Sequence, residues 1–186
     1  MPMKKESELL ETAILDKNES SLNYFVKNVV ICRKKLKVLA FSLEKAEKSK
    51  HELLVLFKKI KRITKEGIVI QSINDIVKLS QMPSIEKDFK KNKSLIGFDV
   101  FTYKKEIVGV VKDTIINEKN GKLIAFCMSG GVVDDLVEGY SIIPLIYTIN
   151  RIDFKNENII IEKGIEKPAL LHQGGLKNLL GISKEK

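Results

Sequence analysis

The residues that could carry chemistry are few and lie far apart in this sequence. His51 and His172 are its two histidines, and Cys32 and Cys127 are its two cysteines. None of them stands at a metal-ligand spacing such as H-x-x-x-H or C-x-x-C. A Cys/His nucleophilic pair would need the fold to bring distant residues together. Both cysteines lie inside apolar runs, which is typical of small core residues, so we expect neither a catalytic pair nor a disulfide.

One acidic cluster lies beside glycines. Asp134, Asp135 and Glu138 follow Gly130-Gly131. Carboxylates can bind a hard cation, but this spacing is not that of a calcium loop. The glycines could cradle a phosphate, but the adjacent Asp pair would repel it, so turn geometry is the better interpretation. No P-loop or G-x-G-x-x-G motif is present, and we expect no metal, no cofactor and no enzymatic activity.

Basic residues form the other candidate site. Nucleic-acid binding would require them on one face, with aromatic side chains for stacking if the ligand is single-stranded. Phe57 and Phe89 are the aromatic residues close by, and each could equally be a core residue. Scattered solvated charge is the interpretation that the sequence favours, and convergence into one patch is the alternative. The candidate contact patch is Arg33, Lys34, Lys35, Lys37, Lys58, Lys59, Lys61 and Arg62.

Composition limits the classes of protein to consider. The 186 residues allow one medium domain or two small ones, and 44% hydrophobic residues can form a packed core. Residues 1–72 hold 16 Lys/Arg against 9 Asp/Glu, which is most of the net charge of +9. Such a basic region can favour RNA, anionic lipid or an acidic protein. The charged N-terminus shows no signal peptide, and no window approaches the roughly 18 apolar residues of a membrane span, so we expect a cytoplasmic protein.

An internal repeat sets the organisation. VKNVVICRKKLKVLAF (26–41) aligns without gaps on VKDTIINEKNGKLIAF (111–126), with seven identities in sixteen positions. Flanking segments extend the match in the same order, so we infer two copies of one unit. Each copy consists of short runs rich in Val and Ile, which predict strands of a small barrel or sandwich.

Turn residues predict where the second copy bends. Gly109 within a strand run indicates a bulge or tight bend, and Asn120-Gly121 indicates a hairpin turn. Pro144 cannot donate to a ladder, which favours an edge strand or a short crossover. The first copy has Lys35-Leu36 in place of Asn120-Gly121. Since neither residue suits positive φ, we expect a different or longer loop there.

The rest of the chain is assigned by composition. Segment 42–56 is charged and could be helical, but its counterpart favours a polar loop that enters a strand. Between the copies, Ser72 could cap a short helical piece that ends before Pro83, which predicts a structured linker. Leu176, Leu179 and Leu180 have helical spacing in the C-terminal tail.

The second copy resembles a PRC-barrel domain. The resemblance is carried by Ser94-Leu95-Ile96-Gly97, Val100, Gly109, Val111-Lys112-Asp113, Asn120-Gly121-Lys122-Leu123, Ala125-Phe126 and Ile143-Pro144. The whole chain is similar to the tandem PRC-barrel proteins of Gram-positive bacteria, although the first copy lacks the glycines and the proline. The resemblance implies a mainly β fold of two small barrels in tandem, joined by a short helical linker. The predicted parts are 7–72 (divergent, basic first barrel), 73–91 (linker), 92–164 (second barrel) and 165–186 (tail).

Known relatives use such barrels to contact other proteins. In ribosome-maturation factors the barrel docks onto a ribosomal protein, and in the photosynthetic reaction centre it forms the cytoplasmic part of the H subunit. The resemblance therefore implies a non-enzymatic binding or adaptor module that bridges cytoplasmic protein partners. The alternatives are an RNA- or ribosome-associated factor that uses the basic first barrel and, by family analogy alone, a sporulation or envelope role.

Overall fold

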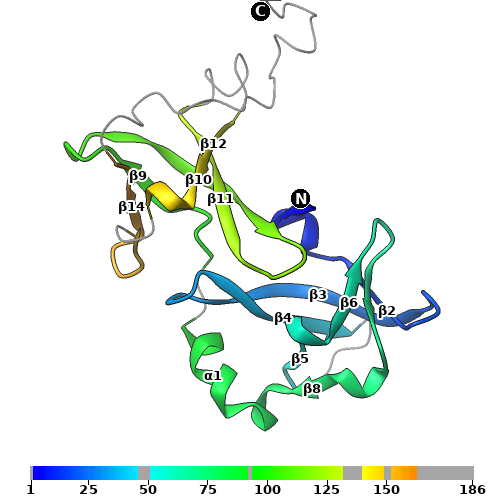
Figure 1. Cartoon of the computed structure of the whole chain (residues 1–186). Coiled ribbons are helices and arrows are strands. Elements are labelled where there is room, and N and C mark those ends of the chain that lie inside the picture. The colour runs from blue at the N-terminus through cyan, green and yellow to red at the C-terminus, as the bar shows by residue number, and fades with distance from the viewer. Residues whose placement is uncertain (1, 46–50, 92–93, 132–139, 149–151, 163–186) are drawn as a thin grey trace, which may run out of the picture. The chain divides into compact units, whose positions relative to one another are not determined.

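The structure, a computed structural model of the whole chain, describes residues 2–45, 51–91, 94–131, 140–148 and 152–162. Within these ranges the chain is mainly β and has a single α-helix, α1 (Pro83–Lys90), as the Val/Ile-rich runs predicted (Figure 1). It forms two compact units. The first unit holds residues 1–94 together with 116–123, and the second unit holds residues 95–115 together with 124–186.

The first unit is built on a seven-stranded sheet of order β6-β7-β2-β3-β4-β5-β8. Its long hairpin β3–β4 is antiparallel, and β2 pairs in parallel with β7 through Ile14–Ile68 and Leu15–Val69. The chain enters it through β1 (Met3–Lys5) and a 3-10 turn, η1 (Ser7–Leu9). The strands are β2 (Ala13–Leu15), β3 (Ser21–Cys32), β4 (Lys37–Lys45), β5 (Leu53–Leu56), β6 (Ile60–Ile63), β7 (Ile68–Ile70) and β8 (Ile76–Lys78).

Aliphatic side chains and one phenylalanine supply the core of this unit. Ile14, Val26, Phe41, Leu54 and Ile68 are each fully buried. Buried and exposed positions alternate only in part along these strands, as in β4, where Val38 and residues 40–43 are all buried. The expectation of a polar loop over 42–56 was correct only in part. Residues 42–45 are not a loop, because they continue strand β4 to Lys45. Strand β5 begins at Leu53, as the strand that the segment enters, and residues 46–50 lie outside the described part.

Residues 73–91 are packed into the first unit. Strand β8 pairs with β5 through Leu54–Val77 and its neighbours, and α1 places Ile85 in a cluster with Val30 and Leu56. Ser72 and Asp75 form a capping box at the 3-10 turn η3 (Ile73–Asp75), as the Ser72 cap predicted. A second 3-10 turn, η4 (Leu79–Gln81), leads into α1. The segment is structured, as expected, but it is an integral part of the first unit, because β8 extends the sheet and Val77, Leu79, Ile85 and Phe89 pack on its core.

The second unit has a sheet of order β12-β11-β10-β9-β14-β13. Strand β9 pairs in parallel with β14 through Val100–Ile159. Its core includes Phe98 and Phe126, and the Phe98 ring packs edge-on against Phe154 with the ring centroids 5.7 Å apart. The strands are β9 (Asp99–Phe101), β10 (Ile107–Asn117), β11 (Leu123–Ser129), β12 (Ser141–Pro144), β13 (Ile152–Asp153) and β14 (Asn158–Ile160), and the 3-10 turn η5 (Leu145–Tyr147) follows β12.

Two of the turn predictions for the second unit are confirmed. The pairing of β10 with β9 shifts register between Ile107 and Gly109, which is the predicted irregularity. Strand β12 is the last strand in its sheet among the described residues, as Pro144 predicted.

The prediction of different hairpin loops was wrong. Cys32 pairs with Lys37 across loop 33–36, and the amide of Asn117 donates to the carbonyl of Lys122 across loop 118–121. Each loop has four residues, and its last residue is left-handed, with φ of 44° at Leu36 and 71° at Gly121. Leu36 accepts this backbone strain because its side chain is buried.

The two sheets share one connectivity. In both, a short strand pairs with a long hairpin on one side and in parallel with a late strand on the other. A 3-10 turn follows the third antiparallel strand in each, η2 (Phe57–Lys59) after β5 and η5 after β12. The first sheet differs by its additional edge strand, β8.

Candidate partner-binding groove

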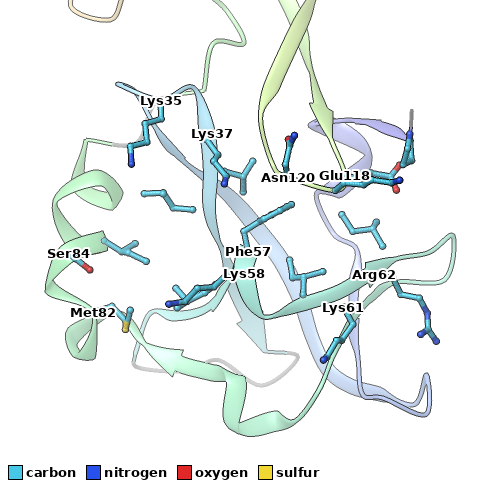
Figure 2. Close-up of a pocket in the computed structure, with 18 residues that line it drawn as sticks. Lys35, Lys37, Phe57, Lys58, Lys61, Arg62, Met82, Ser84, Glu118 and Asn120 are labelled. Carbon is cyan, nitrogen blue, oxygen red and sulfur yellow. The ribbon is translucent and has the colours of Figure 1, made fainter.

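A groove of about 950 Å³ opens on the first unit (Figure 2). All of its lining residues belong to this unit. They come from Pro2, from loop 33–36 and the start of β4, from the end of β5 with η2 and β6, from Met82 and the start of α1, and from loop 118–121. We call this feature the basic groove. Its volume is in the range of ligand-binding clefts.

The charged side chains of the basic groove are almost all cationic. Glu118 is the single acidic residue in its lining. No ion pair joins the five lysines to any other residue in the described parts of the chain, and their charge is therefore available to an anionic partner. The cationic residues are Lys35, Lys37, Lys58, Lys61, Arg62 and Lys119.

Five of the eight residues predicted as a contact patch thus lie in one groove, and three do not. Arg33 donates a hydrogen bond to the backbone carbonyl of Lys91 instead. Lys34 is exposed outside the groove. Lys59 lies outside it and forms an ion pair of 3.0 Å with Asp75. The side chains of Lys58 and Lys59 diverge because they are neighbours on a tight 3-10 turn.

The floor of the groove is apolar. Its half-buried side chains are large enough to accept further apolar contact. Phe57 lies at the centre, with its ring tilted at 55° to that of Phe41 and the ring centroids 6.2 Å apart. Figure 2 shows Phe57 pointing toward loop 118–121. The half-buried floor residues are Leu39, Phe57, Ile60, Ile63 and Met82.

One wall of the groove comes from a distant part of the sequence. Loop 118–121 is held rigid because Asn117 Oδ1 accepts hydrogen bonds from the amides of Lys119 and Asn120. Gly121 lies against Phe57 so closely that an added Cβ would be 3.0 Å from the ring. Sequence reasoning missed Lys119 as a groove residue. No local signal could identify it, because its position depends on contacts between segments more than 80 residues apart.

Strand β6 forms the opposite side. It contains Lys61 and Arg62, whose side chains are both exposed, and Arg62 forms an ion pair with Glu19. Strand β6 pairs with β7, with a shift of register between Ile60 and Arg62. No strand in the described ranges pairs with its other edge.

The other candidate residues lie apart from this groove. His51 is exposed, Cys127 is buried and Cys32 is half-buried. Asp134, Asp135, Glu138, His172 and the tail leucines lie outside the described residues. Within the described ranges, no three His, Cys, Asp or Glu residues cluster closely enough to hold a metal ion, and no helix there is long and apolar enough to span a membrane.

Two carboxylates outside the groove, Glu66 and Asp153, have a lowered pKa. The pKa of Glu66 is lowered by its own backbone N–H and then by the hydroxyl of Thr64. The pKa of Asp153 is lowered by the backbone and side-chain amides of Asn156 and then by the backbone N–H of Lys155. Each carboxylate caps a surface turn, so both shifts reflect local turn geometry.

Comparison with known proteins identifies the second half of the chain. Residues 87–167 match the PRC-barrel domain family. No curated protein matches the chain. The matched range contains β9 to β14, Gly109 and loop 118–121, the features on which the sequence resemblance rested. Residues 87–167 are therefore a PRC-barrel domain.

Proposed function

We propose that this protein is a non-enzymatic protein-binding module made of two PRC barrels, in which a divergent, basic barrel precedes the PRC-barrel domain at 87–167. It bridges cytoplasmic partners. The observation that carries the binding function is the basic groove, which combines six cationic side chains with an apolar floor. The second barrel is supported by the repeat at an offset of 85 residues and by the strand order common to both sheets.

The lining of the groove favours binding over catalysis. It contains neither histidine nor cysteine, and Glu118 is its single carboxylate. General acid–base or nucleophilic chemistry would require such groups in hydrogen-bonding reach of each other. A row of lysines on an apolar floor matches a partner that is acidic and partly apolar.

The floor favours a protein over a nucleic acid. Single-stranded RNA would need aromatic faces on which to stack its bases. Phe57 packs against Phe41 on one side and lies close to Gly121 on the other, which limits its use as a stacking platform. The aliphatic residues Leu39, Ile60 and Ile63 match apolar side chains better than bases.

The two units present different surfaces at equivalent positions, which supports an adaptor role. The 3-10 turn of the first unit carries Lys58 and Lys59. The corresponding turn of the second unit carries Ile146 and Tyr147, which are 72% and 40% exposed. A protein with one cationic and one apolar contact surface can hold two chemically different partners at once.

Affinity purification with the full chain tests the proposal. Lys58→Glu with Lys61→Glu reverses two groove charges, and Lys17→Glu with Lys105→Glu makes the same change at exposed positions outside the groove. We expect the wild type and the outside variant to recover the same acidic partner after nuclease treatment, and the groove variant to lose it. Recovery of that partner by the groove variant at the wild-type level would refute the proposal.

An RNA- or ribosome-associated function is the second candidate, favoured by the six cations of the groove. Phosphate contacts would release counterions, so affinity would fall steeply as salt rises. Binding of a ribosomal RNA fragment that the groove variant loses and the outside variant keeps would support this candidate. Absence of such binding at low salt would exclude it.

A further inference from the structure

We infer that the partner of the basic groove binds as an extended, acidic strand added to the free edge of β6, and that it takes Arg62 from Glu19. The inference rests on the proposed function, because it specifies how a protein partner would use the groove. It depends on three observations: the free edge of β6, the charges on that edge, and the Arg62–Glu19 ion pair.

The edge of β6 opens on the groove. Strand β6 is the outermost strand of its sheet in the described parts of the chain, and all four of its residues, Ile60 to Ile63, line the groove. The inner edge pairs with β7. The outer edge has no strand partner in the described parts of the chain, and its N–H and C=O groups can pair with an extended segment.

The charges on the edge select the partner. A second copy of this chain would place Lys61 and Arg62 against the same residues of its own β6, and like charges opposite each other destabilise a strand pair. An acidic segment meets Lys61 and Arg62 on β6 and Lys58 just before it. Its alternate side chains would be apolar, because the floor at Phe57 and Ile63 is apolar.

The geometry also limits the length of the added strand. Four residues of β6 span about 13 Å at the usual rise per residue. The register shift between Ile60 and Arg62 interrupts a flat edge, and such bulges restrict indiscriminate strand pairing. A short segment therefore suffices, and a long amyloid-like strand is disfavoured.

One of these cations, Arg62, already forms an ion pair with a carboxylate of the same chain, that of Glu19. Glu19 accepts from Arg62 and lies in the turn after β2, where its backbone is held in the left-handed region with φ of 65°. Both side chains are about half exposed. A partner carboxylate competes with Glu19 for Arg62, so Glu19 weakens binding.

Fluorescence anisotropy with the full chain tests the inference. The probe is a short labelled peptide in which Asp and Val alternate, compared with a Lys/Val version and with a polyuridine oligonucleotide. Two N-methylated Asp/Val peptides carry the methyl groups on one or the other set of alternate residues. Only one set of amides in an added strand faces the edge. We expect one methylated peptide to lose about tenfold or more in affinity, as several backbone hydrogen bonds are lost, and the other to bind like the parent.

Two variants and one control variant test the charges. Glu19→Gln is expected to raise the affinity for the Asp/Val peptide by about two- to fivefold, which corresponds to the free energy of an exposed ion pair. Lys61→Glu should weaken it by about tenfold, while Lys65→Glu, an exposed change outside the groove, should not affect it. All three positions are exposed, and circular dichroism verifies that each variant is folded.

The outcomes separate this inference from the proposed function. Equal binding of both methylated peptides overturns strand addition, and unchanged affinity in Glu19→Gln overturns the exchange of Arg62 from Glu19. Either result leaves the groove as a protein site. Failure of every acidic peptide, in a protein whose groove variant still loses its partner in affinity purification, also overturns the inference alone. Tight binding of polyuridine with no binding of the acidic peptide overturns both.

Discussion

The backbone amide of Val38 donates a hydrogen bond of 2.8 Å to the carbonyl oxygen of Gly121, although the two residues are far apart in the sequence. A second bond of 2.9 Å runs from the amide of Leu123 to the carbonyl of Leu36, and Lys37 and Lys122 are bridge partners. The tips of the two long hairpins thus form a small antiparallel ladder inside the first unit. The basic groove is complete only when loop 118–121 is in this position.

Gly121 is the residue on which this ladder depends most. Its φ of 71° favours glycine, and a Cβ would meet the Phe57 ring at 3.0 Å. We expect Gly121→Ala to destabilise the protein by about 1–2 kcal/mol, from backbone strain and displacement of Phe57. Urea denaturation measures the effect, with Lys119→Ala as the neighbouring control. An unchanged urea midpoint in Gly121→Ala would mean that the loop does not press on Phe57.

Gly109 has a different reason to be glycine. An added Cβ would lie 2.3 Å from the carbonyl oxygen of Ser129 and 2.8 Å from Cγ of Met128. We expect Gly109→Ala to cost about 1–3 kcal/mol, because β10 must move away from β11. Thermal unfolding checks this prediction. Val108→Ala, at the adjacent half-buried position, should cost less, and a reversed order would contradict the close approach.

The sequence predicted these strands well and the interactions between distant residues poorly. The period and composition of runs such as Leu123–Ser129 determine strands locally, and Gly109 and Pro144 mark a bulge and an edge through their own backbone chemistry. The left-handed Leu36 was missed because its cost is offset by burial of its side chain, which is a tertiary effect. Lys119 was missed because its place in the groove is fixed by the bond between Val38 and Gly121.

Helix α1 provides a test of where the first unit ends. Ile85 is 9% exposed and packs against Leu54 and Leu56. We expect Ile85→Ala to destabilise the protein by about 2–4 kcal/mol, the usual cost of truncating a buried aliphatic side chain. Lys87→Ala, on the exposed side of the same helix, is the control. A neutral Ile85→Ala in chemical denaturation would show that residues 83–90 act as a linker.

The Asp153 carboxylate should make the free energy of unfolding fall as the pH becomes acidic. Its pKa is lowered below the ordinary 3.8, mainly by the amides of Asn156. A lowered pKa in the folded state means that the carboxylate stabilises the fold above its unfolded pKa, and that this contribution is lost as pH falls through the folded pKa. Asp153→Ala should therefore be less stable than wild type at neutral pH, and the difference should shrink in acid. Carboxyl-carbon NMR measures the pKa directly, and a value at or above 3.8 would contradict the turn geometry.

Substitutions at the adjacent residues Lys58 and Lys59 should have different effects, with Lys59→Ala changing stability and Lys58→Ala changing binding. Lys59 pairs with Asp75, whose side chain is 11% exposed and also accepts the amide of Ser72. Because Lys59 itself is 52% exposed, solvent screens the pair, and Lys59→Ala should cost only about 0.5–1 kcal/mol. Lys58 lines the groove and forms no ion pair within the described residues, so Lys58→Ala should leave the urea midpoint unchanged.

The same two variants should behave in the opposite way toward an acidic partner. Lys58→Ala removes a groove cation and is expected to weaken binding of an acidic peptide by about two- to fivefold at low salt, with the difference fading as salt screens the charge. Lys59→Ala should bind like wild type, because its ammonium group already neutralises Asp75. Anisotropy titrations at two salt concentrations measure both. Equal losses in the two variants would show that the partner responds to the net charge of the first unit, and the groove would then have no special role.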